Sequence, residues 1–227
     1  MHVELIVLEN ERAAAQAAGE LLAQAARTGG HVALSGGKTP ELAYRTAARL
    51  EPNWGGVEVW WGDERCVPPD DDRSNYLLAK RTLLEHVQTP PRDVHRVRGE
   101  LEPEQAAAEY DAALPGVRLG LNLLGIGPDG HTASLFPCAP GLGEEQRLAI
   151  AAEPGLDPKV VRVTMTPPML RNADLVLFLV AGEEKAEAAA RAFAGPESRG
   201  TPASLIRSAG GRTVAILDRA AASLIER

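Results

Sequence analysis

Short apolar runs alternate along the chain with longer stretches in which apolar residues recur every three or four positions. Apolar runs of about four to eight residues, bounded by glycine, proline or polar residues, are typical of buried strands. This pattern predicts strands at 3–8, 31–34, 57–61, 119–124, 160–165, 174–180 and 213–217. Further candidates are 94–97 and 147–152, the second within a stretch rich in proline and glycine, 137–158, that we expect to be irregular.

Helix signals fill the intervals between these strands. Capping residues, a proline at the first helical position and a closing glycine mark helix ends, and alanine-rich or periodic segments lie between them. The predicted helices are 11–27 with Asn10 as cap and Gly29-Gly30 as stop, 40–50 with Thr39 as cap, 75–84 with Ser74 as cap, 103–114, 167–172 after Thr166, 186–194, 202–206 after Thr201, and a final helix that Asp218 caps.

The order of these elements indicates the fold class. Strands alternate with helices along most of the chain, which predicts an α/β fold with a mostly parallel sheet and helices on both faces, a Rossmann-like three-layer sandwich. No linker or internal repeat interrupts the 227 residues, so we expect a single domain over 1–227.

The composition narrows the possible partners. A net charge of −7 without a basic run argues against nucleic-acid binding, so any anionic ligand must be bound by a local group of cations. No apolar run approaches the ~20 residues of a membrane span, and the first residues do not form a signal peptide. Cys66 and Cys138 lie far apart and outside any metal-binding spacing. We therefore expect a cytoplasmic protein that holds no metal and acts on a small molecule.

Polar residues follow four of the predicted strands, at 35–39, 63–65, 129–131 and Lys185. If the strands are parallel, these segments meet at one edge of the sheet, where ligands bind in open α/β sheets. The first segment is a glycine turn that leads into a helix N-terminus, an arrangement that binds anions. A plain tight turn with a capped helix explains that segment equally well, because the complete P-loop and dinucleotide fingerprints are both missing.

Three motifs carry a resemblance to a known family. They are Ser35-Gly36-Gly37-x-Thr39-Pro40, Gly62-Asp63-Glu64-Arg65 followed by Ser74-Asn75-Tyr76, and Gly125-x-Gly127-x-Asp129-Gly130-His131-Thr132-Ala133-Ser134-Leu135-Phe136-Pro137. In these motifs the chain resembles the 6-phosphogluconolactonases. The resemblance implies hydrolysis of 6-phospho-D-glucono-1,5-lactone to 6-phosphogluconate in the oxidative pentose phosphate pathway, by a monomer and without a cofactor.

Lactone hydrolysis needs an activated water, a place for negative charge on the carbonyl oxygen and a grip on the phosphate. His131 is the candidate general base, because histidine titrates near pH 6.5 and can accept a proton at neutral pH. A histidine in such a loop can also be a hydrogen-bonded structural residue. Asp129 and Asp63 either orient the imidazole or cap their own turns.

The resemblance also implies a phosphate site. Arg65 and Lys185 are assigned to the phosphate, with a position of Arg65 nearer the lactone carbonyl as an alternative. The turn contributes its donors, namely those of Ser35, Gly36, Gly37 and Thr39. Lys38 stands where the family usually has serine or threonine, and we expect it to point to solvent rather than to add a charge at the phosphate.

Other functions fit the sequence less well. Glucosamine-6-phosphate deaminases resemble the chain in the same glycine turn and histidine loop, but they carry a glutamate where this chain has Phe136, which cannot relay a proton. A catalytically silent sugar-phosphate sensor would carry a DNA-binding segment ahead of the strand at 3–8. The serine-hydrolase elbow and the paired histidines of metallohydrolases are both missing from the sequence.

Overall fold

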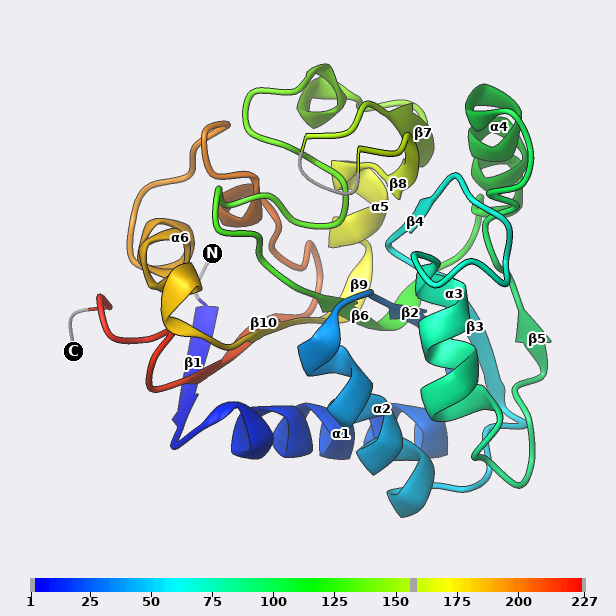
Figure 1. Cartoon of the computed structure of the whole chain (residues 1–227), viewed down its shortest axis with the longest axis horizontal. Coiled ribbons are helices and arrows are strands. Elements are labelled where there is room, and N and C mark those ends of the chain that lie inside the picture. Colours follow the sequence, from blue (N-terminus) through cyan, green and yellow to red (C-terminus); the bar gives the residue numbers. More distant parts are fainter. Residues whose placement is uncertain (1–2, 156–158, 226–227) are drawn as a thin grey trace.

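The computed structural model describes residues 3–155 and 159–225 (Figure 1). Its main sheet has seven strands, and every neighbouring pair is parallel. In spatial order they are β1 (Val3–Leu8), β10 (Arg212–Asp218), β9 (Ala173–Val180), β6 (Leu119–Leu124), β2 (Gly30–Leu34), β3 (Val57–Trp61) and β5 (Asp93–Val94). The predicted parallel α/β sheet is confirmed, and all its carboxyl ends lie at one edge.

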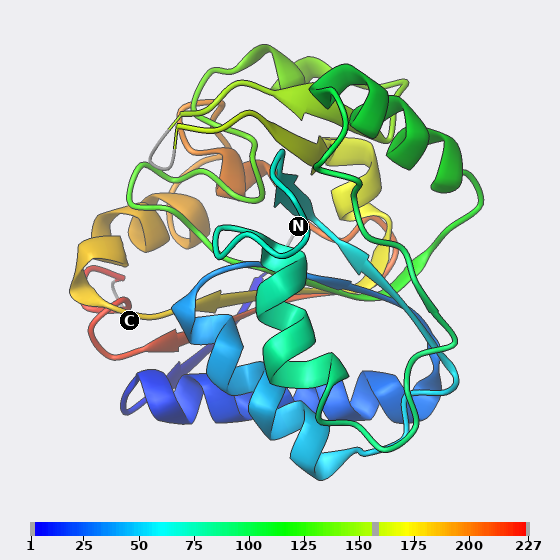
Figure 2. The ribbon, with the colours of Figure 1, turned by 45° about the vertical axis from the view of Figure 1, so that its right-hand side comes forward.

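Helices cover both faces of this sheet, with α1 and α2 packed together below it and α4, α5 and α6 above it (Figures 1 and 2). The bounds are α1 (Glu11–Thr28), α2 (Lys38–Leu50), α3 (Asn75–Ala79) with its π-helical continuation η1 (Lys80–Leu84), α4 (Pro103–Ala113), α5 (Pro167–Arg171) and α6 (Ala186–Phe193). None of the helices within the described residues has both the length and the hydrophobicity needed to cross a membrane.

Alternation along the strands explains why both faces are covered. In β2, Val32 and Leu34 pack against α1 and α2, whereas Ala33 between them packs on the opposite side. Leu177 of β9 likewise belongs to the lower core and Phe178 to the upper one. Because successive side chains point to opposite faces, a strand that is apolar throughout must be buried on both sides.

A second, three-stranded antiparallel sheet lies above the main one and was not predicted. It consists of β4 (Asp63–Arg65), β8 (Arg162–Met165) and β7 (Ala149–Ala152). The sequence predicts β7 and β8 as strands with wider bounds, but it treats 63–65 as a polar loop after β3. These residues instead pair with β8, so that the chain passes from one sheet to the other at Gly62.

Several predicted helix ends need correction. The second helix begins at Lys38 with Gly37 as its cap, and the hydroxyl of Thr39 donates to Glu11 instead. The predicted final helix after Asp218 is wrong over 219–225, where one backbone hydrogen bond spans four residues and two span three, so that no regular helical ladder forms. Within the stretch 137–158, residues 156–158 lie outside the described residues.

The close contact of α1 with α2 depends on Gly19. A Cβ atom at this position would lie 2.7 Å from both the carbonyl oxygen of Ala43 and the Cβ of Thr46. We therefore expect Gly19→Ala to lower the free energy of unfolding by about 1–3 kcal/mol, because overpacking outweighs the better helix propensity of alanine. Urea denaturation measures this loss. Gln24→Ala on the exposed side of α1 is the control, and equal stability of the two variants would contradict the prediction.

Candidate active site

A cavity of about 310 Å³ opens at the carboxyl edge of the main sheet. It brings together most of the predicted site residues: Ser35, Gly36 and Gly37 after β2, Asp63 and Arg65 in β4, His131 after β6, and Lys185 after β9. Asn75, Arg162 and the backbone of 125–128 complete much of the wall. Residues up to 150 positions apart in the sequence thus share one small cavity, as the convergence of parallel strand ends predicts.

Two predicted residues are absent from this wall. Thr39 is turned to Glu11, 2.8 Å from its carboxylate, and Lys38 beside it is exposed as expected. Asp129 does not line the cavity either, but its carboxylate holds the imidazole that does. Thr39 therefore drops out of the candidate phosphate site, whereas Asp129 stays as a partner of His131.

The His131–Asp129 pair is the central contact of the loop after β6. Nδ1 of His131 lies 2.6 Å from Oδ1 of Asp129, and the same oxygen accepts a hydrogen bond from the backbone N–H of His131. Burial by itself would raise the pKa of the Asp129 carboxyl, but these hydrogen bonds outweigh it, so that the pKa lies below its usual value. An ionised Asp129 favours the tautomer in which Nδ1 carries the proton and Nε2 is free to accept one.

Close packing within the loop fixes the orientation of this pair. A Cβ atom on Gly127 would lie 2.0 Å from two atoms of the imidazole and 2.9 Å from the carboxylate of Asp129, so only glycine fits there. Two backbone hydrogen bonds close the loop. The N–H of Gly127 donates to the carbonyl of His131, and the N–H of Gly130 donates to the carbonyl of Gly127. Ala133, further along the loop, has a φ of 49°, which is strained for any residue with a side chain.

Three positively charged side chains line the same cavity as His131. Arg65, Arg162 and Lys185 all line the cavity. Burial lowers the pKa of Lys185, and nearby Glu184 and Glu11 partly oppose this effect. The Nε of Arg65 and the Oγ of Ser35 are buried without a hydrogen-bond partner among the described residues. Buried donors in this state are uncommon in folded proteins, and an anionic ligand would satisfy them.

A family model described as glucosamine-6-phosphate isomerases/6-phosphogluconolactonase matches residues 9–215. The chain belongs to this family. A 6-phosphogluconolactonase of Haemophilus influenzae is 37% identical over 204 residues, 86% of this chain and 87% of the relative. One from Streptomyces coelicolor is 35% identical over an alignment of 249 positions, which covers 99% of this chain and 95% of the relative. The structure of 6-phosphogluconolactonase from Trypanosoma cruzi matches with a TM-score of 0.85 at 27% identity. The match covers 98% of this chain and 97% of that one.

Within this member of the glucosamine-6-phosphate isomerase/6-phosphogluconolactonase family, a buried carboxylate organises the wall of the cavity. Glu64 accepts hydrogen bonds from the backbone N–H groups of Arg65, Asn75 and Tyr76, each at 2.7 Å, and from the hydroxyl of Ser74 at 3.0 Å. Burial raises the pKa of Glu64, and these hydrogen bonds oppose the rise. The carboxylate thereby anchors the N-terminus of α3 to β4, which explains the spacing between the two sequence motifs.

Asp63 has a different role from the one considered in the sequence. Its carboxylate accepts a hydrogen bond from the hydroxyl of Ser134 at 2.7 Å, and Asn75 donates to its backbone oxygen at 2.9 Å. Neither contact involves His131. Gly36 lies so close to Asn75 that a Cβ atom would come within 1.9 Å of the amide oxygen. Asp63 therefore connects β4 with the histidine loop, while Asn75 connects it with the glycine turn.

The sequence reasoning missed Arg162 and the function of Glu64. Arg162 lies within the predicted strand 160–165, and nothing local distinguishes it from a surface arginine. Glu64 stands out in the sequence only as a charged residue next to Asp63, because three of its four hydrogen-bond donors lie ten or more positions away. No group of three or more histidine, cysteine, aspartate or glutamate residues in 3–155 and 159–225 is placed to hold a metal ion.

Replacement of Glu64 tests its anchoring role. Glu64→Gln keeps the size of the side chain but turns an NH₂ group toward buried donors, so we expect a loss of about 1–3 kcal/mol in unfolding free energy. Hydrogen exchange at the amides of Asn75 and Tyr76 should accelerate more than elsewhere in the chain. Glu145→Gln at an exposed position is the matched control. Unchanged exchange at these two amides would contradict the assignment.

Proposed function

We propose that this protein hydrolyses 6-phospho-D-glucono-1,5-lactone to 6-phospho-D-gluconate, the second step of the oxidative pentose phosphate pathway. The observation that carries the proposal is one cavity that is lined both by an imidazole held by a carboxylate and by three cations. The relatives named 6-phosphogluconolactonase support the same substrate. The cavity volume of about 310 Å³ suits a phosphorylated sugar lactone.

His131 is the proposed general base. Its Nε2 removes a proton from a water molecule while the resulting hydroxide adds to the lactone carbonyl carbon. The ionised Asp129 holds Nδ1 and stabilises the imidazolium that forms. The tetrahedral intermediate then collapses with cleavage of the bond between the carbonyl carbon and the ring oxygen. The imidazolium returns its proton to that oxygen, which becomes the hydroxyl of the open acid.

We assign each cation to one of the two ends of the substrate, the phosphate or the lactone carbonyl. Lys185 and the 35–37 turn are assigned to the phosphate, since a lysine charge and the start of α2 both attract a phosphate group. Arg162 is assigned to the negative charge that develops on the carbonyl oxygen, because it packs on the same aromatic ring as His131. Arg65 also lines the cavity, with a buried Nε that has no hydrogen-bond partner among the described residues, and we assign it to the phosphate.

The deaminase reaction of the same family is the less favoured alternative. It needs a proton relay where this chain carries Phe136, whose ring has no ionisable group. A monomeric, cytoplasmic enzyme without a cofactor is the corresponding expectation for the whole protein, and each of these properties stays a prediction.

A coupled assay tests the proposed function directly. The lactone is generated from glucose 6-phosphate by its dehydrogenase, and 6-phosphogluconate is then measured with 6-phosphogluconate dehydrogenase. We expect the purified protein to accelerate product formation well beyond spontaneous lactone opening. No acceleration, or release of ammonia from glucosamine 6-phosphate instead, would overturn the proposal.

The role of His131 predicts a large effect on turnover. His131→Ala should lower kcat by about 10²–10⁴-fold with KM largely unchanged, because general-base catalysis is worth that much. Steady-state kinetics in the coupled assay gives both constants. His86→Ala, at an exposed histidine away from the cavity, is the control and should behave like the wild type. Near-normal turnover of His131→Ala would refute the assignment.

The role of Lys185 predicts a change in binding instead. Lys185→Ala should raise KM by about 10- to 100-fold, as expected for the loss of a charge-assisted contact to the phosphate, with a smaller effect on kcat. Lys38→Ala is the matched control, because Lys38 lies beside the glycine turn but is exposed and absent from the wall. An unchanged KM for Lys185→Ala would remove Lys185 from the phosphate site.

A further inference from the structure

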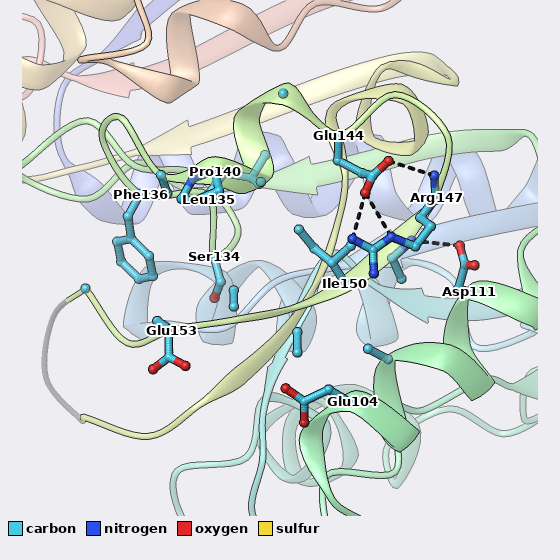
Figure 3. Close-up of a pocket in the computed structure, with 18 of the residues that line it drawn as sticks. Glu104, Asp111, Ser134, Leu135, Phe136, Pro140, Glu144, Arg147, Ile150 and Glu153 are labelled. Atoms are coloured by element: carbon cyan, nitrogen blue, oxygen red, sulfur yellow. Dashed lines mark hydrogen bonds and ion pairs between the residues drawn. The ribbon is translucent and has the colours of Figure 1, made fainter.

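A second and larger cavity, of about 780 Å³, lies next to the candidate active site. It is bounded by α4, by β7 and by the segment that follows the histidine loop. Figure 3 shows Ser134, Phe136 and Glu153 on one side of it and Asp111 of α4 on the other. The two cavities are neighbours, because Ser134 in the wall of the larger one directly follows Ala133 in the wall of the smaller one.

Phe136 is the side chain at this boundary. It lines the larger cavity, and its ring contacts two residues that line the smaller one. The centroid of the ring is 4.9 Å from that of the His131 imidazole, with the planes tilted by 44°. The guanidinium carbon of Arg162 lies 5.4 Å from the same centroid. One ring thus contacts both the proposed base and the cation assigned to the carbonyl oxygen.

The ring itself is held firmly in place. Phe136 is only 7% exposed, and the main chain at Gly155 presses against it. A Cβ atom on Gly155 would lie 2.3 Å from Cδ1 of the ring. A ring confined in this way restricts the orientations open to the groups that pack on it. The aromatic contact with His131 and the cation–π contact with Arg162 are also attractive, so they favour the observed orientations.

We propose that Phe136 is a positioning residue for lactone hydrolysis. Its ring sets the direction of the His131 imidazole, which Asp129 holds at only one nitrogen, and it holds the Arg162 guanidinium beside the same reacting carbonyl. The ring also forms part of the wall of the larger cavity, as Glu153 does. This inference rests on the proposed lactonase function.

The test is a substitution that removes the aromatic ring of Phe136 but keeps an apolar side chain. Phe136→Leu should lower kcat by about 3- to 30-fold, the range expected when a partly desolvated cation–π contact is lost, and should leave KM within about twofold. We expect KM to be preserved because Phe136 is not part of the wall formed by Lys185 and the 35–37 turn, to which the phosphate is assigned. Phe136→Met is measured in parallel, so that a folding defect in one variant leaves the comparison intact.

Two further variants separate positioning from a general loss of stability. Phe136→Tyr keeps the ring, and the adjoining cavity has room for the added hydroxyl, so kcat should return to within about twofold of the wild type. Phe193→Leu is the matched control. Phe193 packs on Phe178 at 5.3 Å and on the Arg207 guanidinium at 5.8 Å, and it lines neither cavity. It should lower the melting temperature without lowering kcat.

A double-mutant cycle with Arg162→Lys assigns the effect to the guanidinium contact. Lysine keeps the charge but loses the planar group that packs on the ring, so Phe136→Leu should lower kcat less in this background than in the wild type. Equal kcat values for Phe136→Leu and the wild type, or full additivity in the cycle, would overturn the inference. Absence of lactonase activity in the wild type would instead overturn the proposed function, so the two failures are distinguishable.

Discussion

The buried carboxylate of Glu64 is the constraint on which the geometry of the site depends. An ionised carboxylate loses its hydration on burial and is tolerated only when donors replace the lost water. Here the donors are the hydroxyl of Ser74 and three backbone N–H groups, two of them at the N-terminus of α3. Because side chains alternate along a strand, a Glu64 that points to α3 leaves Asp63 and Arg65 on the other side of β4. Both of them line the cavity.

The histidine loop is attached to the same strand. The hydroxyl of Ser134 donates to Asp63, and that of Thr132 donates back to the carbonyl of Gly125, so the loop is fixed at both its start and its end. Glycine at position 127 lets the imidazole lie directly against the main chain. The hydrogen bond from Ser134 to Asp63 thus couples the histidine loop to β4, the strand that carries Arg65.

Local patterns were sufficient for much of the architecture and for part of the site. Apolar runs predicted the long strands, and their parallel order placed Ser35, His131 and Lys185 at one edge. The antiparallel sheet was missed because its strands are only three or four residues long, and because the pairing of β4 with β8 joins segments about 100 positions apart. Arg162 was missed for the same reason, since only that pairing brings β8 to the cavity. The Thr39 cap was wrong because Gly37 adopts a φ of 109°, which lets the helix begin one residue before Thr39.

The electrostatics of the cavity connect its structure with its chemistry. The chain carries a net charge of −7, yet three cations share about 310 Å³. Burial lowers the pKa of Arg162 and of Lys185, which means that the folded protein holds both charges in an environment that disfavours them. In the proposed reaction, a bound phosphate and a developing oxyanion offset this cost. Phe136 contacts both the Arg162 guanidinium and the His131 imidazole, so in that reaction it keeps the two groups in fixed positions while the charge develops.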